Sequence, residues 1–271
     1  MNRRGVRALV RRDLAIVRRS GPLMAPLYVL PILMSAFVPG LIGILPRLVG
    51  DLSADPDVAK LLARLPTGTR QEWAGLSDDQ AIVTLLTVQL LAPLFLLLPF
   101  MVSNVIAADS FAGERERKTL ESLLYTPLTD RELFLAKTIT AWIPSLIVTA
   151  LSFIVTTIVV NAAAWPTMHR IFFPNLMWIV LVVWVAPAVA ALGLSAMVLV
   201  SARVRGVQES IQLSGLFVLP MVVLVIAQVR GVMMLGTRNV LIAGLVLWVV
   251  SGALLWYGGR SFRRESLIAR V

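Results

Sequence analysis

The chain has 271 residues, of which 58% are hydrophobic and only 15% are charged, a composition that excludes a soluble globular protein and indicates a lipid bilayer. The absence of Cys excludes disulfides, thiolate metal sites, iron–sulfur clusters and cysteine nucleophiles, and a single His disfavours an imidazole-rich metal site. In a membrane protein, the net charge of +10 directs attention to which connections hold the excess Lys and Arg.

The first predicted element is an amphipathic interfacial helix over residues 1–20. Apolar residues such as Val6, Leu9 and Val10 share one arc of a helical wheel, and most of the arginines fill the other arc. This pattern suits a basic anchor on anionic lipid and suits a role in gating equally well. Asp13 lies inside the apolar arc, and the sequence offers no reason for it.

Six apolar runs are long enough to cross roughly 30 Å of hydrocarbon, so we predict an all-α polytopic membrane protein. The predicted spans are residues 23–45, 81–108, 133–160, 171–200, 211–229 and 240–257. Proline lies inside several of these runs, which predicts bent helices.

The distribution of positive charge predicts the orientation of these spans. An even number of spans places both termini on one side, and 18 of the 25 Lys and Arg residues fall on that side. The positive-inside rule therefore predicts that both termini are cytoplasmic. The longest outer connection, residues 46–80, is expected to be a solvated extracytoplasmic loop that ends in a capping box, Ser77 to Gln80, at the start of span two.

The spans contain almost none of the ionisable groups that a membrane enzyme or an ion pump requires. No carboxylate pair is available for acid–base catalysis, and the run G-E-R-E-R-K-T at residues 113–119 lacks the second glycine and the preceding strand of a phosphate-binding loop. We therefore predict that the chain is not an enzyme and has no ATPase motif, metal or cofactor of its own. Energy for transport would have to come from another subunit or from an ion gradient.

The connection between spans two and three carries the strongest signal. Glu114 and Glu116 open a short amphipathic helix, leucines share one of its faces, and Pro127 ends it, so we predict a helix over residues 111–127. A second capping box, Thr129 to Glu132, then starts span three. A connection that only joined two spans would need a few residues, whereas this one is structured and charged.

This connection resembles the signature of ABC transporter permeases of the ABC-2 type, in the run Glu114-Arg115-Glu116, Thr119-Leu120-Glu121, Leu123-Leu124, Pro127 and Lys137. The interfacial helix and the six spans are similar to the layout of that family. Lys118 and Ala136 depart from the pattern, because Gly is frequent at both positions in the family. The resemblance is specific over this connection and architectural over the rest of the chain.

The resemblance implies the permease subunit of an ATP-driven exporter in a bacterial or archaeal plasma membrane. Residues 111–127 would be a coupling helix that docks in a groove of a separate ATP-binding subunit, which would hold the ATP and Mg. The expected contacts with that subunit are Glu114, Arg117, Leu120, Glu121, Leu123 and Leu124. The expected partners also include a second copy or a homologous permease, and membrane lipid, with no nucleic acid.

In that family spans two and five line the interface of a dimer, where alternating access would move the substrate. The candidate pathway residues are therefore Gln89, Ser103, Asn104, Gln212 and Ser214. Amides and hydroxyls in spans more often simply join neighbouring helices. The less favoured alternative for residues 111–127 is an ordinary surface helix.

Two other functions stay open at this point. A gradient-driven secondary carrier would require a buried acid or matching broken helices in the two halves of the chain, and no inverted repeat is evident. A membrane-embedded lipid-modifying enzyme would require clustered Asp, Glu or His at one membrane face, whereas His169 lies alone in an outer connection.

Overall fold

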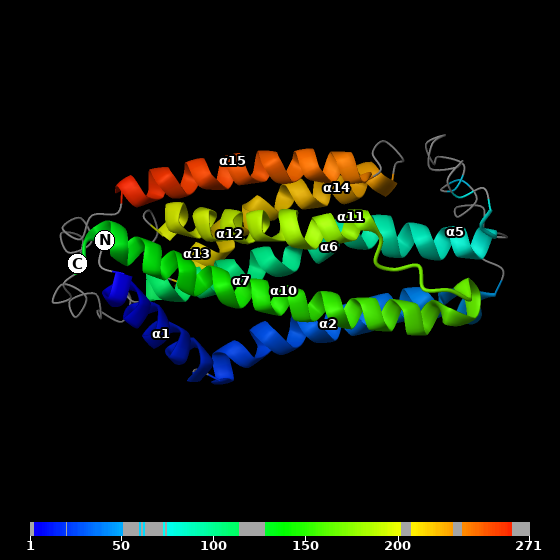
Figure 1. Cartoon of the computed structure of the whole chain (residues 1–271), viewed down its shortest axis with the longest axis horizontal. Helices are drawn as coiled ribbons and strands as arrows, with labels where there is room; N and C mark the ends of the chain where they lie inside the picture. Colours follow the sequence, from blue (N-terminus) through cyan, green and yellow to red (C-terminus); the bar gives the residue numbers. More distant parts are fainter. Residues whose placement is uncertain are drawn as a thin grey trace.

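A computed structural model describes residues 3–19, 21–50, 60, 62, 73, 75–113, 128–201, 207–229 and 235–261. Throughout these ranges the regular structure is helical and no strand occurs. The helices run along one long axis and form an elongated bundle (Figure 1). The chain is therefore an all-α polytopic membrane protein, as its composition predicts.

Five helical runs are long and apolar enough to cross a membrane within the part of the chain that the structure describes. The first is α2 (Gly21–Val49). The second is continuous from Asp78 to Gly113 and comprises α5 (Asp78–Thr84), the π-helix η2 (Leu85–Leu90), α6 (Leu91–Phe95), α7 (Leu97–Ala108) and the π-helix η3 (Asp109–Gly113).

The third run is α10 (Asp130–Met168). The fourth comprises α11 (Leu176–Val180), the π-helix η4 (Leu181–Val185) and α12 (Ala186–Ser201), and the last is α15 (Thr237–Ser261). Both predicted capping boxes are present, with Ser77 opening α5 and Thr129 opening α10.

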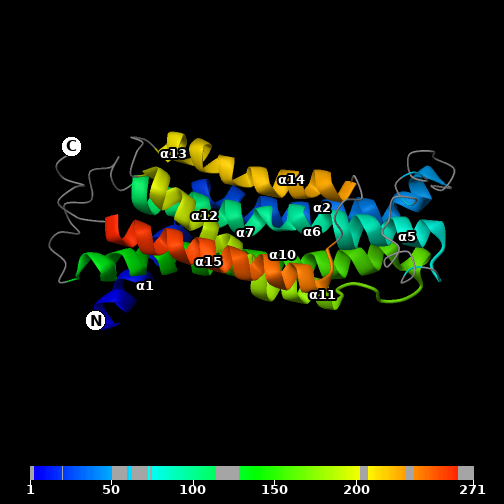
Figure 2. The same ribbon diagram turned by 90° about the horizontal axis from the view of Figure 1, so that it is seen from above.

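The predicted fifth span, residues 211–229, is not one regular helix. It lies on α13 (Val207–Ser214), a 3₁₀ turn η5 (Gly215–Val218) and α14 (Leu219–Val229). Gly215 has a low helix propensity, and Pro220 cannot donate a backbone hydrogen bond to the preceding turn, so the α-helix tightens between them. The three pieces follow one line beside the other helices (Figure 2) and are together long enough to cross the bilayer.

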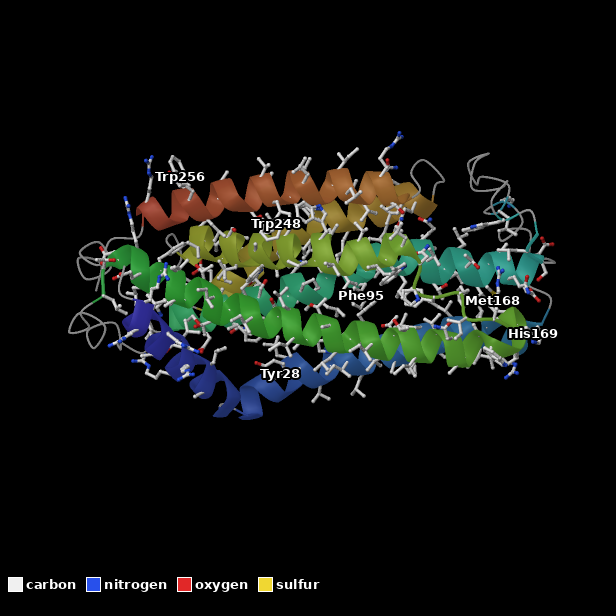
Figure 3. The ribbon with its side chains drawn as sticks, viewed as in Figure 1. Tyr28, Phe95, Met168, His169, Trp248 and Trp256 are labelled. Atoms are coloured by element: carbon white, nitrogen blue, oxygen red, sulfur yellow. The ribbon has the colours of Figure 1, made fainter. Side chains whose placement is uncertain are left out.

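The two ends of the bundle differ in which elements meet there. The α1 end holds the amphipathic helix α1 (Arg3–Arg19), the beginning of α10 and the last turn of α15, which includes Trp256 (Figure 3). The His169 end holds Met168, His169 and the beginning of α5. The beginning of α1 and the end of α15 therefore lie at the same end of the bundle, as an even number of spans requires.

The centre of the bundle is the second and fourth helical runs. In their most apolar stretches 67% and 61% of residues are buried, against 17% in each of the flanking helices α2 and α15. Glycine allows close helix approach at several positions, and Gly43 and Gly193 are two of them. A Cβ on Gly43 of α2 would lie 2.6 Å from the Cβ of Ala163 in α10, and one on Gly193 of α12 would lie 2.7 Å from the carbonyl oxygen of Phe100 in α7.

Candidate functional site

The predicted coupling helix is bounded by two described elements at the α1 end. Its first residues, Phe111 to Gly113, belong to η3, which continues α7. Residues 114–127, called here the 114–127 segment, lie outside the described residues, and so do the six predicted contacts Glu114, Arg117, Leu120, Glu121, Leu123 and Leu124. The description resumes at Leu128 and Thr129, directly before α10.

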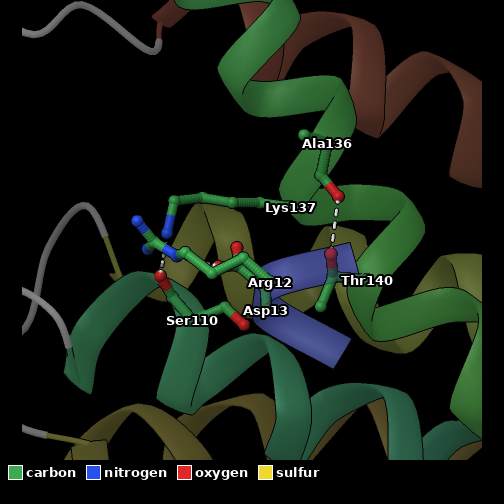
Figure 4. Close-up of polar contacts among 6 residues, drawn as sticks. All are labelled: Arg12, Asp13, Ser110, Ala136, Lys137 and Thr140. Atoms are coloured by element: carbon green, nitrogen blue, oxygen red, sulfur yellow. Dashed lines mark hydrogen bonds and ion pairs between the residues drawn. The ribbon is translucent and has the colours of Figure 1, made fainter. Parts of the chain in front are cut away.

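Lys137 joins the two sides of this segment. Its side chain is only 1% exposed, and its Nζ donates a hydrogen bond of 2.6 Å to the carbonyl oxygen of Ser110 in η3 (Figure 4). The same Nζ lies 5.6 Å from the ring centroid of Phe111. A lysine near the C-terminal turns of a helix is favourable because the carbonyl dipoles there point toward it. Lys137 thus ties the end of the second helical run to the beginning of α10.

The exit of the segment is fixed by the capping box of α10. A carboxylate oxygen of Glu132 accepts hydrogen bonds from the backbone N–H of Thr129 at 2.9 Å and from its hydroxyl at 3.0 Å. In return the Thr129 hydroxyl accepts from the backbone N–H of Glu132 at 3.4 Å. This reciprocal pairing fixes the direction in which the chain enters α10.

The amphipathic helix α1 packs against the same place. Val6 and Leu9 are buried against Leu128, Leu133 and Ala136. The apolar face of α1 therefore contacts α10 and the residue that follows the 114–127 segment, so α1 is more than a lipid anchor.

The buried position of Asp13 is explained by this docking. Asp13 is 8% exposed, and its carboxylate accepts a hydrogen bond of 3.1 Å from Nε of the neighbouring Arg12. Both side chains project from α1 toward the region where Lys137 meets Ser110 (Figure 4). Asp13, Glu132 and Lys137 thus place three buried ionisable side chains at the α1 end.

The predicted pathway residues have different environments. The side-chain amide of Gln89 forms two hydrogen bonds with the backbone of Leu235. It donates to the Leu235 carbonyl at 3.2 Å and accepts from the Leu235 N–H at 2.8 Å. Ser103 donates to the Phe100 carbonyl at 3.0 Å, and Asn104 is also buried. These three side chains therefore serve packing within the bundle in this conformation.

The two candidates on α13 differ from those three. Gln212 is exposed on α13, and Ser214 lies at its end with a side chain outside the described ones. A mid-depth cavity between α2, α6 and α10, beside Ser35 and Thr156, has a volume of about 110 Å³ and is not lined by any of the five candidates. That volume is below the roughly 300–1,000 Å³ of pockets that bind drug-sized molecules.

One polar residue of α14 stands out although it is absent from the predicted set. Gln228 is 1% exposed, and neither its amide nitrogen nor its amide oxygen has a hydrogen-bond partner among the residues that the structure describes. A buried amide without partners loses the hydrogen bonds that water would supply. In the sequence, Gln228 is the single amide side chain in the apolar run of residues 219–229. Its burial in the structure distinguishes it from Gln212, which is exposed.

Among the described residues no group of three or more His, Asp or Glu side chains is arranged to hold a metal ion.

Comparison with known proteins agrees with the arrangement of helices. The model of the family described as ABC-2 family transporter protein matches residues 8–257, which include α2, α10, most of α15 and the 114–127 segment. No curated protein matches the chain. With a match over almost its whole length, the chain belongs to the ABC-2 family of transporter proteins.

Proposed function

We propose that this chain is the permease subunit of an ATP-driven exporter and that residues 111–127 dock in a groove of a separate ATP-binding subunit. Membership of the ABC-2 family supports a membrane transport subunit that works with such a partner. The observation that carries the finer proposal is that the described residues on both sides of the 114–127 segment are tied to α10: Ser110 by Lys137, and Thr129 by Glu132.

This attachment matters because a push on a loose loop would be absorbed by the loop. Lys137 holds η3, and the capping box with α1 holds the exit of the segment. Closure of the ATP-binding subunits would therefore move the segment, the end of α7 and the beginning of α10 as one unit. The Leu and charged residues of the segment would supply a ridge for a groove and charges for its register.

The substrate would pass between two copies, or between this chain and a homologous permease. Span two and the interrupted α13–α14 run would line that interface, with the exposed Gln212 on α13 as a side chain available there and Ser214 as a further candidate on the same helix. The small volume of the mid-depth cavity is in keeping with a pathway between subunits. Gln89, Ser103 and Asn104 would reach the pathway only if the second helical run moves.

The excess of Lys and Arg at the α1 end supports cytoplasmic termini in a plasma membrane. The 114–127 segment would then face the cytoplasm, where the partner subunit holds ATP and Mg. Catalysis would reside in that subunit, and this chain would contribute transport alone.

Co-purification tests the proposal. The tagged chain is extracted from its native membrane in mild detergent, as wild type and as the double variant Glu114→Lys, Leu123→Asp. A matched control, Arg47→Glu, Leu48→Asp, places a charge reversal and an apolar-to-acid change at the exposed end of α2. We expect an ATP-binding subunit to accompany the wild type and the control, and to be lost from the double variant.

If the wild type purifies without an ATP-binding subunit under all extraction conditions, the proposal is wrong and a gradient-driven carrier becomes the better explanation. If the double variant retains the subunit, the ATP-driven function stands, but the docking role of residues 111–127 does not.

A further inference from the structure

A second site lies at the α1 end, between the first turns of α10 and the last turns of α15. The structure has a cavity of about 740 Å³ there, open to one side, whose lining includes Arg131 and Leu135 of α10 and Leu255, Trp256 and Arg260 of α15. None of the residues that carry the proposed function, apart from the capping box, belongs to it.

The wall of the cavity forms where the two helices touch. A Cβ on Gly259 would lie 3.3 Å from the ring of Phe134, so α15 approaches α10 closely at this level. Farther from the α1 end the same helices meet through Trp142 and Trp248, whose ring centroids are 6.3 Å apart. The cavity thus lies between two spans that are in contact, and the Trp142–Trp248 pair joins the same spans farther from the α1 end.

The chemistry of the lining is divided. Arg131 and Arg260 are exposed, and neither forms an ion pair with a carboxylate that the structure describes. Glu132, which also lines the cavity, has a carboxylate oxygen engaged by Thr129. The remaining wall is apolar, with Leu135 38% and Trp256 61% exposed. The guanidinium carbon of Arg260 lies 3.8 Å from the Trp256 ring centroid, which holds this arginine over the indole.

Two arginines above an apolar wall, at the end of two membrane helices, match the boundary between lipid headgroups and acyl chains. Arginine binds phosphate through two parallel N–H donors, and exposed Leu and Trp side chains suit a hydrocarbon chain. The volume lies within the range of small-molecule sites.

We propose that this cavity binds one anionic phospholipid, with its phosphate at Arg131 and Arg260 and an acyl chain along Leu135, Leu255 and Trp256. The lipid would bridge α10 and α15 and would lie beside the capping box that fixes the exit of the 114–127 segment. The described lining comes from these two spans and from Thr129, and the proposal does not depend on an ATP-binding partner.

The test compares two variants of the full-length chain in lipid nanodiscs. Arg131→Gln, Arg260→Gln removes both charges of the cavity, whereas Arg47→Gln, Arg238→Gln removes two exposed arginines near the His169 end of α2 and α15. Nanodiscs of phosphatidylcholine alone are compared with nanodiscs that also contain phosphatidylglycerol. Native mass spectrometry counts the lipids that stay bound, and the melting temperature is measured in parallel.

We expect the wild type and the control to retain one phosphatidylglycerol and to melt at a higher temperature when it is present. In the cavity variant we expect an affinity for phosphatidylglycerol that is about thirty-fold lower, since each arginine near an anionic surface contributes a several-fold gain. Its melting temperature in phosphatidylcholine alone should equal that of the wild type, which verifies folding. Arg131→Lys, Arg260→Lys should keep part of the affinity, because the charge remains while the paired donors are lost.

Equal retention of phosphatidylglycerol by the cavity variant and the wild type would overturn the proposal, and so would equal retention of phosphatidylcholine by the wild type. Inorganic phosphate added without phosphatidylglycerol should not raise the melting temperature. If it raises it as much as the lipid does, the cavity is an anion site and not a lipid site.

Discussion

The two ends of the bundle are held together by different chemistry. At the α1 end the key side chains are ionisable and buried, namely Asp13, Glu132 and Lys137. At the His169 end a neutral side-chain amide joins the chain segments. Asn161 of α10 accepts from the N–H groups of Phe172 at 3.2 Å and Phe173 at 3.3 Å and donates to the Phe173 carbonyl, which fixes the turn after α10.

This difference is the one expected if the α1 end moves during transport and the His169 end does not. A neutral amide that pairs with backbone groups satisfies a loop at little cost, so a static connection needs nothing more. A buried charge costs far more to desolvate, and membrane proteins keep such groups mainly where they function. The end with the costly groups is also the end that carries the 114–127 segment, which is the proposed point of contact with the ATP-binding subunit.

The largest effect is expected from Lys137→Met. This change removes the hydrogen bond to the Ser110 carbonyl and leaves that partly buried acceptor without its donor, which should lower the free energy of unfolding by about 1–2 kcal/mol. The ATP hydrolysis rate of the assembled complex should fall at least about tenfold, because a motion of the segment would no longer reach both helices. Denaturant unfolding and ATPase assays check the two numbers.

Lys137→Arg separates position from charge. The longer, planar guanidinium does not reproduce the single short bond to Ser110, so partial recovery of activity is expected. Full ATPase activity in Lys137→Met would show that the tether plays no part in coupling.

Asn161→Leu is the matching change at the His169 end, and its effect on stability should be similar. Two backbone N–H groups and one carbonyl lose their partner, so the free energy of unfolding should fall by about 2 kcal/mol. ATP hydrolysis per folded molecule should not change, because this end would not take part in coupling. A loss of activity as large as that of Lys137→Met would remove the distinction between the two ends.

The two capping boxes provide a finer comparison. Ser77→Ala and Thr129→Ala each remove one side-chain acceptor at the start of a membrane helix, and each should cost about 1 kcal/mol. Only Thr129→Ala should also slow ATP hydrolysis in the complex, because only that box follows the 114–127 segment. Equal rates for the two variants would argue that the exit of the segment need not be fixed.

Local signals explain what could be predicted from the sequence. The capping boxes and the amphipathic α1 depend on residues within one or two turns of each other, so both are visible in the printed order of residues. Long-range partners are not visible in this way. Lys137 pairs with Ser110 and Gln89 pairs with Leu235, 146 positions away, and nothing near either residue indicates its partner.

The interrupted fifth span shows the opposite problem. Its interior proline, Pro220, predicts a bend, but the apolar run gives no sign that a 3₁₀ turn at Gly215–Val218 separates two α-helices. The sequence also does not show which polar side chains of this span are buried. Gln212 and Gln228 look alike in the sequence, although Gln212 is exposed and Gln228 is buried.

Gln228 supports the last and smallest prediction, and here the expected sign is reversed. Its buried amide has no hydrogen-bond partner in the described part of the chain. Gln228→Leu therefore replaces an uncompensated polar group by an apolar one of similar size and should raise the free energy of unfolding by about 1 kcal/mol. Gln89→Leu is the control, because the same exchange there deprives both backbone groups of Leu235 of their partner and should destabilise the chain. If the amide of Gln228 finds a partner only in another state of the transport cycle, the stabilised variant should hydrolyse ATP more slowly, since the conformation with the enclosed amide would then be favoured. A variant that is stabilised but fully active would limit the role of Gln228 to a cost that the fold tolerates, and a destabilised variant would mean that the amide is satisfied in the native membrane.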